Sequence, residues 1–128
     1  MNAYDPIVEL QRHGYTEREA AFVALVANHS GYFLRRQYLT AIQRDDGALA
    51  QRFLQKIVGH EHARAIEYAA GRHIYHLKSK QIYRIVEQED SQNRRDKSDG
   101  EIKHRLMALD YILAHPARKF FENERVKV

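Results

Sequence analysis

LRRQYLTAIQRDDGALAQRFLQKIVG, residues 34–59, contains two helical patterns separated by an acidic turn. In the first, apolar residues recur at helical spacing, at Leu34, Tyr38, Leu39 and Ile42. The second covers about residues 48–58 and has an apolar stripe of Ala50, Phe53, Leu54, Ile57 and Val58. We expect Asp46 to cap this second helix and Gly59 to end it in a left-handed conformation. The stretch therefore predicts two helices joined by a tight turn.

The flanking sequence adds a helix before this pair and a β-hairpin after it. Thr16 and Glu19 have the spacing of a capping box and begin a helix over about residues 16–29. Residues 32–33 then form a short extended link. After Gly59, residues 60–68 and 72–78 alternate polar with β-branched or aromatic residues around Ala69-Ala70-Gly71, which predicts a hairpin. Ser79 is expected to cap one further short helix.

The remainder of the chain divides into a polar segment and a last helix. QEDSQNRRDKSDG, residues 88–100, contains no large apolar residue and is interpreted as a solvated linker or mobile loop. Beyond it, a strongly amphipathic helix ends at His115-Pro116. The expected organisation is a domain over 1–87, a linker over 88–100, and a C-terminal helix and tail over 101–128.

Composition and length indicate one folded domain. The chain has 128 residues, of which 44% are hydrophobic and 30% charged. No apolar run is long enough to cross a membrane, and Asn2 and Asp5 stand where a secretory signal carries basic residues. We therefore expect a cytoplasmic protein with no membrane partner. The absence of cysteine excludes disulfides, thiolate metal sites and cysteine nucleophiles.

The net charge of +4 is unevenly distributed along the chain. Residues 1–31 have a net charge of −2, and residues 85–128 are neutral. Residues 32–84 contain ten lysines and arginines against four acidic residues, a net charge of +6. A local basic excess of this kind favours a polyanionic partner, although a solvated surface can carry the same charges.

The order of three helices and a hairpin resembles the winged helix-turn-helix superfamily over about residues 16–86. HSGYFLRRQYLTAI (29–42), QRFLQKIVGHEHARAIEY (51–68) and RHIYHLKSK (72–80) are also similar to the N-terminal winged-helix part of bacterial replication-relaxation and mobile-element proteins. The resemblance implies a mainly α fold with a small β-hairpin, the wing. It makes the third helix the recognition helix, with Gln51, Arg52, Gln55 and Lys56 facing the DNA groove and with Arg72 and His73 near the wing tip.

The residue types suit duplex DNA independently of that resemblance. Arginine can bond guanine O6 and N7 together, and glutamine can do the same for adenine N6 and N7. We assign Gln51, Arg52 and Gln55 to base edges. Phosphate contacts, which raise affinity without reading sequence, are assigned to Lys56, Arg35, Arg36, Lys78 and Lys80. The alternative is that all of these residues line a solvated face.

The aromatic residues have two possible roles: stacking on unpaired bases or filling the core. Stacking on unpaired bases is one use of exposed aromatic side chains. Most of the aromatic positions fall on inward or element-joining sites, so we expect them in the core. The residues concerned are Tyr32, Phe33, Tyr38, Tyr68, Tyr75 and Tyr83.

The histidines offer a metal site as an alternative. If His60, Glu61 and His62 lie on one strand and His73 and His76 on its partner, at most three imidazoles converge in a regular hairpin. His-Glu-His is also similar to the paired histidines of rolling-circle replication and relaxase enzymes, but Glu61 replaces the hydrophobic middle residue. No other catalytic motif is present, so we predict no enzyme and no cofactor.

The last helix predicts self-association. Ile102, Leu106, Leu109 and Leu113 form an apolar face, and in winged-helix regulators such a helix commonly pairs with its twin. The alternatives are that this helix folds back on its own chain, or that the chain is a fragment of a longer protein. We expect a homodimeric, sequence-specific DNA-binding protein, either a bacterial transcriptional regulator or an accessory factor of a plasmid or mobile element. The competing interpretations are a protein-interaction module of the same fold and a metal-responsive regulator.

Overall fold

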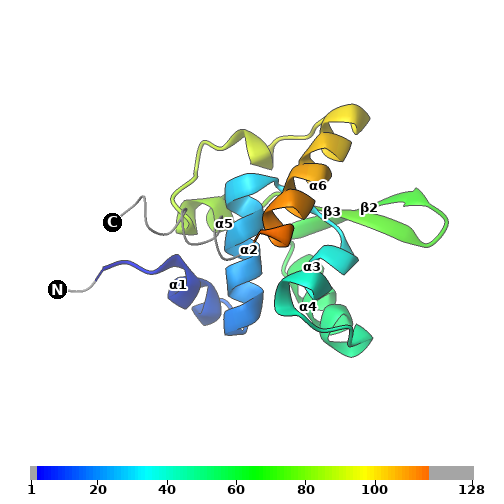
Figure 1. Ribbon diagram of the computed structural model, residues 1–128. Helices are drawn as coiled ribbons and strands as arrows, with labels where there is room; N and C mark the ends of the chain where they lie inside the picture. Colours follow the sequence, from blue (N-terminus) through cyan, green and yellow to red (C-terminus); the bar gives the residue numbers. More distant parts are fainter. Residues whose placement is uncertain (1–2, 116–128) are drawn as a thin grey trace.

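The structure is a computed structural model that describes residues 3–115, and it is mainly helical with a small antiparallel sheet (Figure 1). Its helices are α1 (Pro6–Arg12), α2 (Glu17–His29), α3 (Arg35–Ile42), α4 (Gly47–Gly59), α5 (Lys80–Ile85), the 3₁₀ helix η1 (Gln92–Arg94) and α6 (Asp99–Ala114). Its strands are β1 (Tyr32–Phe33), β2 (Ala63–Ala69) and β3 (Arg72–Leu77). The expected fold class, mainly α with a small β-hairpin, is confirmed.

The strand β3 lies between its two neighbours, in the order β1-β3-β2. β2 and β3 form the expected hairpin, with Ala63 opposite Leu77 and Glu67 opposite His73. The extended link at residues 32–33 is itself a strand, because its two residues pair with β3. The hairpin projects away from the helical body (Figure 1). Residues 67–72 at its outer end are exposed.

Polar caps begin several helices where the sequence predicts them. Thr16 forms a complete capping box with Glu19 at the start of α2. The Asp46 side chain accepts a hydrogen bond from the Ala48 amide at 2.8 Å, and Ser79 caps α5. The helix α1 was not expected, although Asp5 at its N-cap and proline at the next position are a known start signal.

The end of α4 differs from the prediction. Gly59 remains in the helix, and the left-handed residue is Glu61, with φ of 60°. Because β2 begins only at Ala63, His60, Glu61 and His62 form a turn and do not belong to a strand. The amide of His62 closes this turn by donating to the carbonyl of Ile57 at 3.0 Å.

Aromatic rings fill the core between α2, α3, α4 and the sheet. Phe22 meets Phe33, Tyr38 and Phe53 edge-on, with ring centroids 5.2, 5.3 and 5.9 Å apart. The core assignment is correct for Tyr32, Phe33, Tyr38 and Tyr83, which are buried, and Tyr75 is half-buried. It is wrong for Tyr68, which is 54% exposed near the outer end of the projecting hairpin.

The polar segment 88–100 is docked on the fold, where a solvated linker was expected. The Asn93 amide donates to the carbonyl of Ala27 at 2.9 Å, and its backbone carbonyl lies 3.1 Å from the His76 ring. The Lys97 amide donates to the Tyr32 hydroxyl at 3.0 Å. Polar contacts hold this segment in place although it has no large apolar residue. Such contacts leave no periodic pattern in a sequence, so they could not be predicted from it.

The apolar side of α6 packs on its own chain. Leu109 and Leu113 are buried, and the helix contacts α2, α3 and β1. For the apolar face with Leu109 and Leu113, the structure therefore shows the alternative in which the last helix folds back on its own chain. Met107 and Tyr111 remain exposed on α6, and homodimerisation through the helix stays a prediction. The tail from residue 116 lies outside the described residues. Within residues 3–115, no helix has the length and apolar character needed to cross a membrane.

Candidate nucleic-acid interface

The outer face of α4 carries three polar side chains that point into solvent. Gln51, Arg52 and Gln55 are exposed, while the opposite stripe of the same helix is buried in the core. Within residues 3–115, none of these three side chains has a hydrogen-bond or ion-pair partner in the fold. The amphipathic pattern of α4 therefore presents a guanidinium and two amides with all their donors available.

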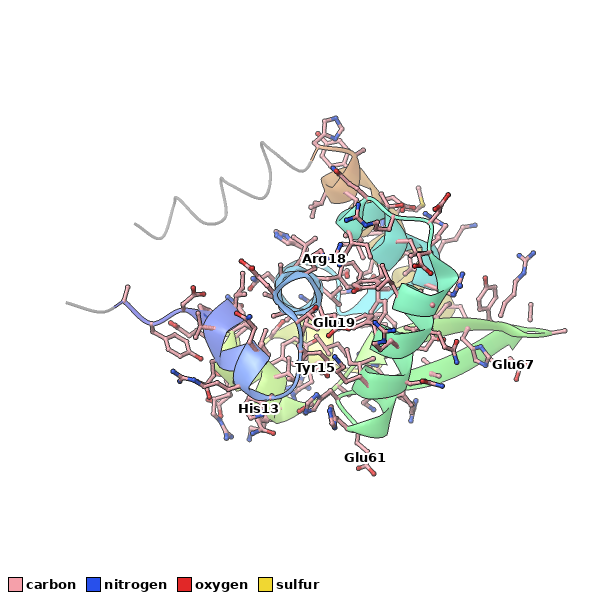
Figure 2. All side chains as sticks on the ribbon, turned by 90° about the horizontal axis from the view of Figure 1, so that it is seen from below. His13, Tyr15, Arg18, Glu19, Glu61 and Glu67 are labelled. Carbon is pink, nitrogen blue, oxygen red and sulfur yellow. The ribbon has the colours of Figure 1, made fainter. Side chains whose placement is uncertain are left out.

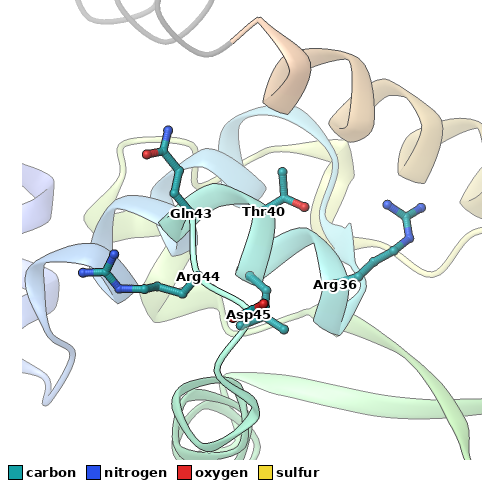
Figure 3. A pocket seen from close by; sticks show the side chains of 6 residues that line it. Arg36, Thr40, Gln43, Arg44 and Asp45 are labelled. Carbon is teal, nitrogen blue, oxygen red and sulfur yellow. The ribbon is translucent and has the colours of Figure 1, made fainter.

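The basic residues of α3 lie beside the start of α4. Arg35 is exposed, and its guanidinium approaches Gly47 so closely that a Cβ there would lie 2.8 Å from it. Along the outer side of α3 and the following turn runs an open hollow (Figure 3). The residues that line it are Arg36, Leu39, Thr40, Gln43, Arg44 and Asp45. Two arginines, a hydroxyl, an amide and the carboxylate of Asp45 thus line an open hollow next to the turn.

The projecting hairpin adds further exposed cations. Arg72 pairs with Ala69 next to the tight turn, where Gly71 has a φ of 71°. His73 is half-buried, opposite Glu67, whose carboxylate accepts from the Gly71 amide at 3.2 Å. Arg64 is also exposed on β2. These positions put Arg72 at the tip of the hairpin, as expected from the sequence.

Lys56 is not on the exposed face. Its ammonium forms an ion pair with Glu19 at 2.6 Å, and it lies 5.8 Å above the ring of Tyr15. The Glu19 carboxylate is buried and also accepts from the Thr16 amide, so Lys56 ties α4 to the start of α2. Figure 2 shows Tyr15 and Glu19 in this layer between the two helices. The assignment of Lys56 to a DNA phosphate is therefore corrected: position 56 lies at the edge of the α4 stripe, where a lysine stem can reach an inner carboxylate.

Two other expected phosphate ligands are paired with carboxylates of the C-terminal segment. Arg36 donates to both oxygens of Asp110, at 2.8 and 2.9 Å. Lys78 lies 3.1 Å from Asp96. Lys80, by contrast, is exposed at the start of α5 and has no carboxylate partner within residues 3–115. The expected candidates thus divide into exposed residues and residues whose charge is already compensated.

The histidines occupy two separate places. His62 is buried, and its Nδ1 lies 2.6 Å from the Tyr15 hydroxyl. His76 is buried on the opposite side of the sheet from Leu77, stacked on Tyr32 with centroids 3.9 Å apart. Burial lowers the pKa of both imidazoles to about 4, and for His62 the nearby His60 acts in the same direction. Both are therefore neutral at pH 7.

The expected grouping of His60, His62, His73 and His76 does not form. The left-handed turn at Glu61 takes His60 and His62 out of the strand, and the register places His73 at the far end of the hairpin. Among the described residues, no three histidine or carboxylate side chains are arranged to hold a metal ion. The Tyr15–His62 pair is enclosed in the core and links the α1–α2 turn to the turn after α4.

Two exposed arginines were absent from the expected contacts. Arg44 lies in the turn after α3, directly after the left-handed Gln43, and its side chain points away from Arg36 (Figure 3). Arg64 lies on β2 at the position that pairs with His76. No helical spacing points to Arg44, because α3 ends at Ile42 and Arg44 follows in the turn. For Arg64 the signal is the strand alternation, which only becomes readable once the start of β2 is known.

Comparison with known proteins finds no counterpart: no family model, curated protein or solved structure matches the chain.

Proposed function

We propose that this chain is a winged helix-turn-helix protein that binds double-stranded DNA. The order α2-β1-α3-α4-β2-β3 and the sheet order β1-β3-β2 support this assignment. In that fold the helix before the hairpin enters the major groove, and the hairpin forms the wing. These roles fall on α4 and on the β2–β3 hairpin.

The exposed face of α4 is the observation that carries the proposal. Gln51, Arg52 and Gln55 have no partners within residues 3–115, although they project from a helix whose other side is firmly packed. Arginine and glutamine are the side chains that bond two acceptors or donors of one base in the major groove. A rigid helix holding three such groups toward solvent is well prepared to read base edges.

We assign the phosphate contacts to lysines and arginines that are exposed in the fold. Arg35 and Arg44 flank the turn before α4, Arg72 lies at the hairpin tip, and Lys80 begins α5. These contacts give affinity and salt dependence without sequence information. Lys56 is excluded because Glu19 holds it. A cytoplasmic transcriptional regulator or a mobile-element accessory factor, acting as a homodimer, remains the biological role that we propose.

Replacement of the α4 face tests the proposal. A variant with Gln51, Arg52 and Gln55 all changed to alanine should lose most of its preference for a selected duplex over a random one, measured by fluorescence anisotropy. Arg12→Ala is the control, because it removes the same charge from α1, which lies on the other side of the molecule from the hairpin (Figure 1). Equal binding by the wild-type chain and both variants would reject α4 as the reading element.

A further inference from the structure

The C-terminal segment, residues 88–115, carries two carboxylates to cations of the proposed DNA-binding surface. Asp110 of α6 receives two parallel hydrogen bonds from the Arg36 guanidinium, at 2.8 and 2.9 Å. A third donor, Nε2 of the buried Gln37, lies 2.9 Å from the same carboxylate. These bonds hold the pKa of Asp110 below its usual value, so it is ionised at neutral pH.

The second carboxylate comes from the segment before α6. Asp96 lies 3.1 Å from the Lys78 ammonium and 3.5 Å from Nδ1 of His76. The side chain of Asp96 is exposed, and it covers the end of β3. Lys78 was expected from the sequence to bind a phosphate, as was Arg36. Both cations are therefore neutralised by residues outside the helices and the hairpin proposed to contact DNA.

The two carboxylates are held in place by a docked backbone. Arg105 of α6 donates to the side chain of Asn93 and to the carbonyl of Ser30, and Asn93 in turn bonds to Ala27. Leu109, next to Asp110, is completely buried. The position of Asp110 is thus fixed by packing and by polar contacts that do not depend on Arg36.

The Arg36 guanidinium remains open to solvent on its other side. It lines the hollow together with Thr40, Arg44 and Asp45, and its side chain is 62% exposed (Figure 3). A phosphate that took the place of Asp110 would meet the two Nη donors that now bond this carboxylate. Carboxylate and phosphate groups both fit the planar fork of arginine, so they compete for it.

We propose that the C-terminal segment restrains DNA binding, with Asp110 and Asp96 occupying Arg36 and Lys78 in the place of backbone phosphates. This inference rests on the proposed DNA-binding function. A duplex that engages the hollow and the hairpin must exchange each carboxylate for a phosphate. Removing a carboxylate therefore frees a cation and strengthens binding, and a change that displaces α6 would act in the same direction.

The test compares charge-neutral variants by duplex titration at several salt concentrations. Asp110→Asn and Asp96→Asn keep the shape of each side chain and remove its charge. Each should bind a random duplex about three- to tenfold more tightly at 0.15 M salt, with the slope of log Kobs against log salt steeper by about 0.9. Asp90→Asn is the matched control, because Asp90 is an exposed residue of the same segment with no partner within residues 3–115. It should change affinity by less than about twofold, since distant exposed charges are screened.

A second measurement separates release of a cation from a general change in charge. Arg36→Gln should weaken binding only slightly in the wild-type chain, where Asp110 already holds the guanidinium. In the Asp110→Asn variant, adding Arg36→Gln should abolish the increase in duplex affinity that Asp110→Asn alone produces. Circular dichroism shows whether Asp110→Asn is folded. If it is not, the same comparison is made with Asp96→Asn, Lys78→Gln and the double variant, because Asp96 lies on an exposed loop.

The outcomes distinguish this inference from the function on which it rests. If the wild-type chain binds DNA and the Asp110 and Asp96 variants match Asp90→Asn in affinity and slope, the restraint is rejected and the function stands. If no variant and no wild-type chain binds duplex at low salt, both are rejected. Binding by the double Asp96→Asn/Asp110→Asn variant alone would support both.

Discussion

Gly31 joins α2 to β1, and both its backbone conformation and its close contact with Asn93 require glycine. Its φ is +78°, and a Cβ at this position would lie 2.3 Å from the carbonyl oxygen of Asn93. An alanine would have both a strained backbone and a clash with the docked segment, at a combined cost of about 3 kcal/mol. The position therefore depends on residues more than sixty places further along the chain.

Gly31→Ala and Gly59→Ala should have opposite effects on stability. Gly59 lies in α4, and a Cβ there has nothing within 4 Å. Alanine at 59 should stabilise the chain by about 0.5 kcal/mol, because it restricts the unfolded chain without strain. Urea unfolding followed by circular dichroism compares the two. Equal midpoints for both variants would show that the docked segment does not pack against Gly31.

Stability should fall as the pH drops from 7 to 5, because two buried histidines are neutral in the fold. In the unfolded chain each titrates near its ordinary pKa of 6.5, whereas burial lowers the pKa to about 4 in the fold. Between these values the unfolded chain binds more protons, so acid favours unfolding. The expected loss is about 2 kcal/mol for each of His62 and His76.

Chemical denaturation at pH 7, 6 and 5 measures this dependence. His62→Gln should remove about half of it, because the glutamine oxygen can still accept from the Tyr15 hydroxyl without titrating. A free energy of unfolding that is constant from pH 7 to pH 5 would contradict the burial of both rings.

Arg52 and Lys80 should differ in what they contribute to DNA binding. Arg52→Ala should reduce the discrimination between a preferred and a mismatched duplex by about 1–3 kcal/mol, because a base contact is lost. Lys80→Ala should weaken binding to both duplexes by the same factor, because a phosphate contact carries no sequence information. Competition titrations with the two duplexes measure both quantities. If Arg52→Ala weakened binding to both duplexes by the same factor, Arg52 would be a phosphate contact and not a base contact.

At the scale of elements, α6 belongs to the core of the protein. Leu109 on its inner side is fully buried, while Met107 on its outer side is 62% exposed. Leu109→Ala should therefore cost about 2–5 kcal/mol of stability, and Met107→Ala less than about 0.5 kcal/mol. Thermal unfolding compares the two variants. A small loss for Leu109→Ala would favour a separate C-terminal helix, as the sequence alone suggests.

Local signals in the sequence predict most elements, because each signal acts within a few residues. Thr16, Asp46 and Ser79 cap the helices that they were expected to cap. The turn at Glu61 was missed because a glutamate rarely adopts positive φ, and its conformation is imposed by the pairing of the following strand.

The sequence was least informative where polar residues make long-range contacts. Gln37, fully buried on α3, bonds to the carbonyl of Leu106 and to Asp110 on α6. Helical spacing identifies apolar faces, but it does not show which polar side chain meets a partner seventy residues away. For the same reason, the sequence pattern puts Lys56 on the outer face of its helix and predicts a solvated linker or mobile loop over residues 88–100, where the structure shows long-range polar contacts.

At the scale of the whole molecule, ion pairs neutralise part of the basic excess of residues 32–84. Residues 32–84 have a net charge of +6, but Arg36, Lys56 and Lys78 are each paired with a carboxylate from outside that range. The uncompensated cations gather on α3, α4, the hairpin and the start of α5. The effective positive surface is therefore smaller than the count of charges suggests, and it depends on the docking of the C-terminal segment.

Binding of a random duplex by the wild-type chain, measured by fluorescence anisotropy between low and physiological salt, tests DNA binding most directly. We expect log Kobs to fall linearly as the logarithm of the salt concentration rises. About four phosphate contacts, at Arg35, Arg44, Arg72 and Lys80, give a slope near −3.6, from about −0.9 for each phosphate contacted. Absence of binding at the lowest salt concentration, or an affinity that does not change with salt, would contradict it.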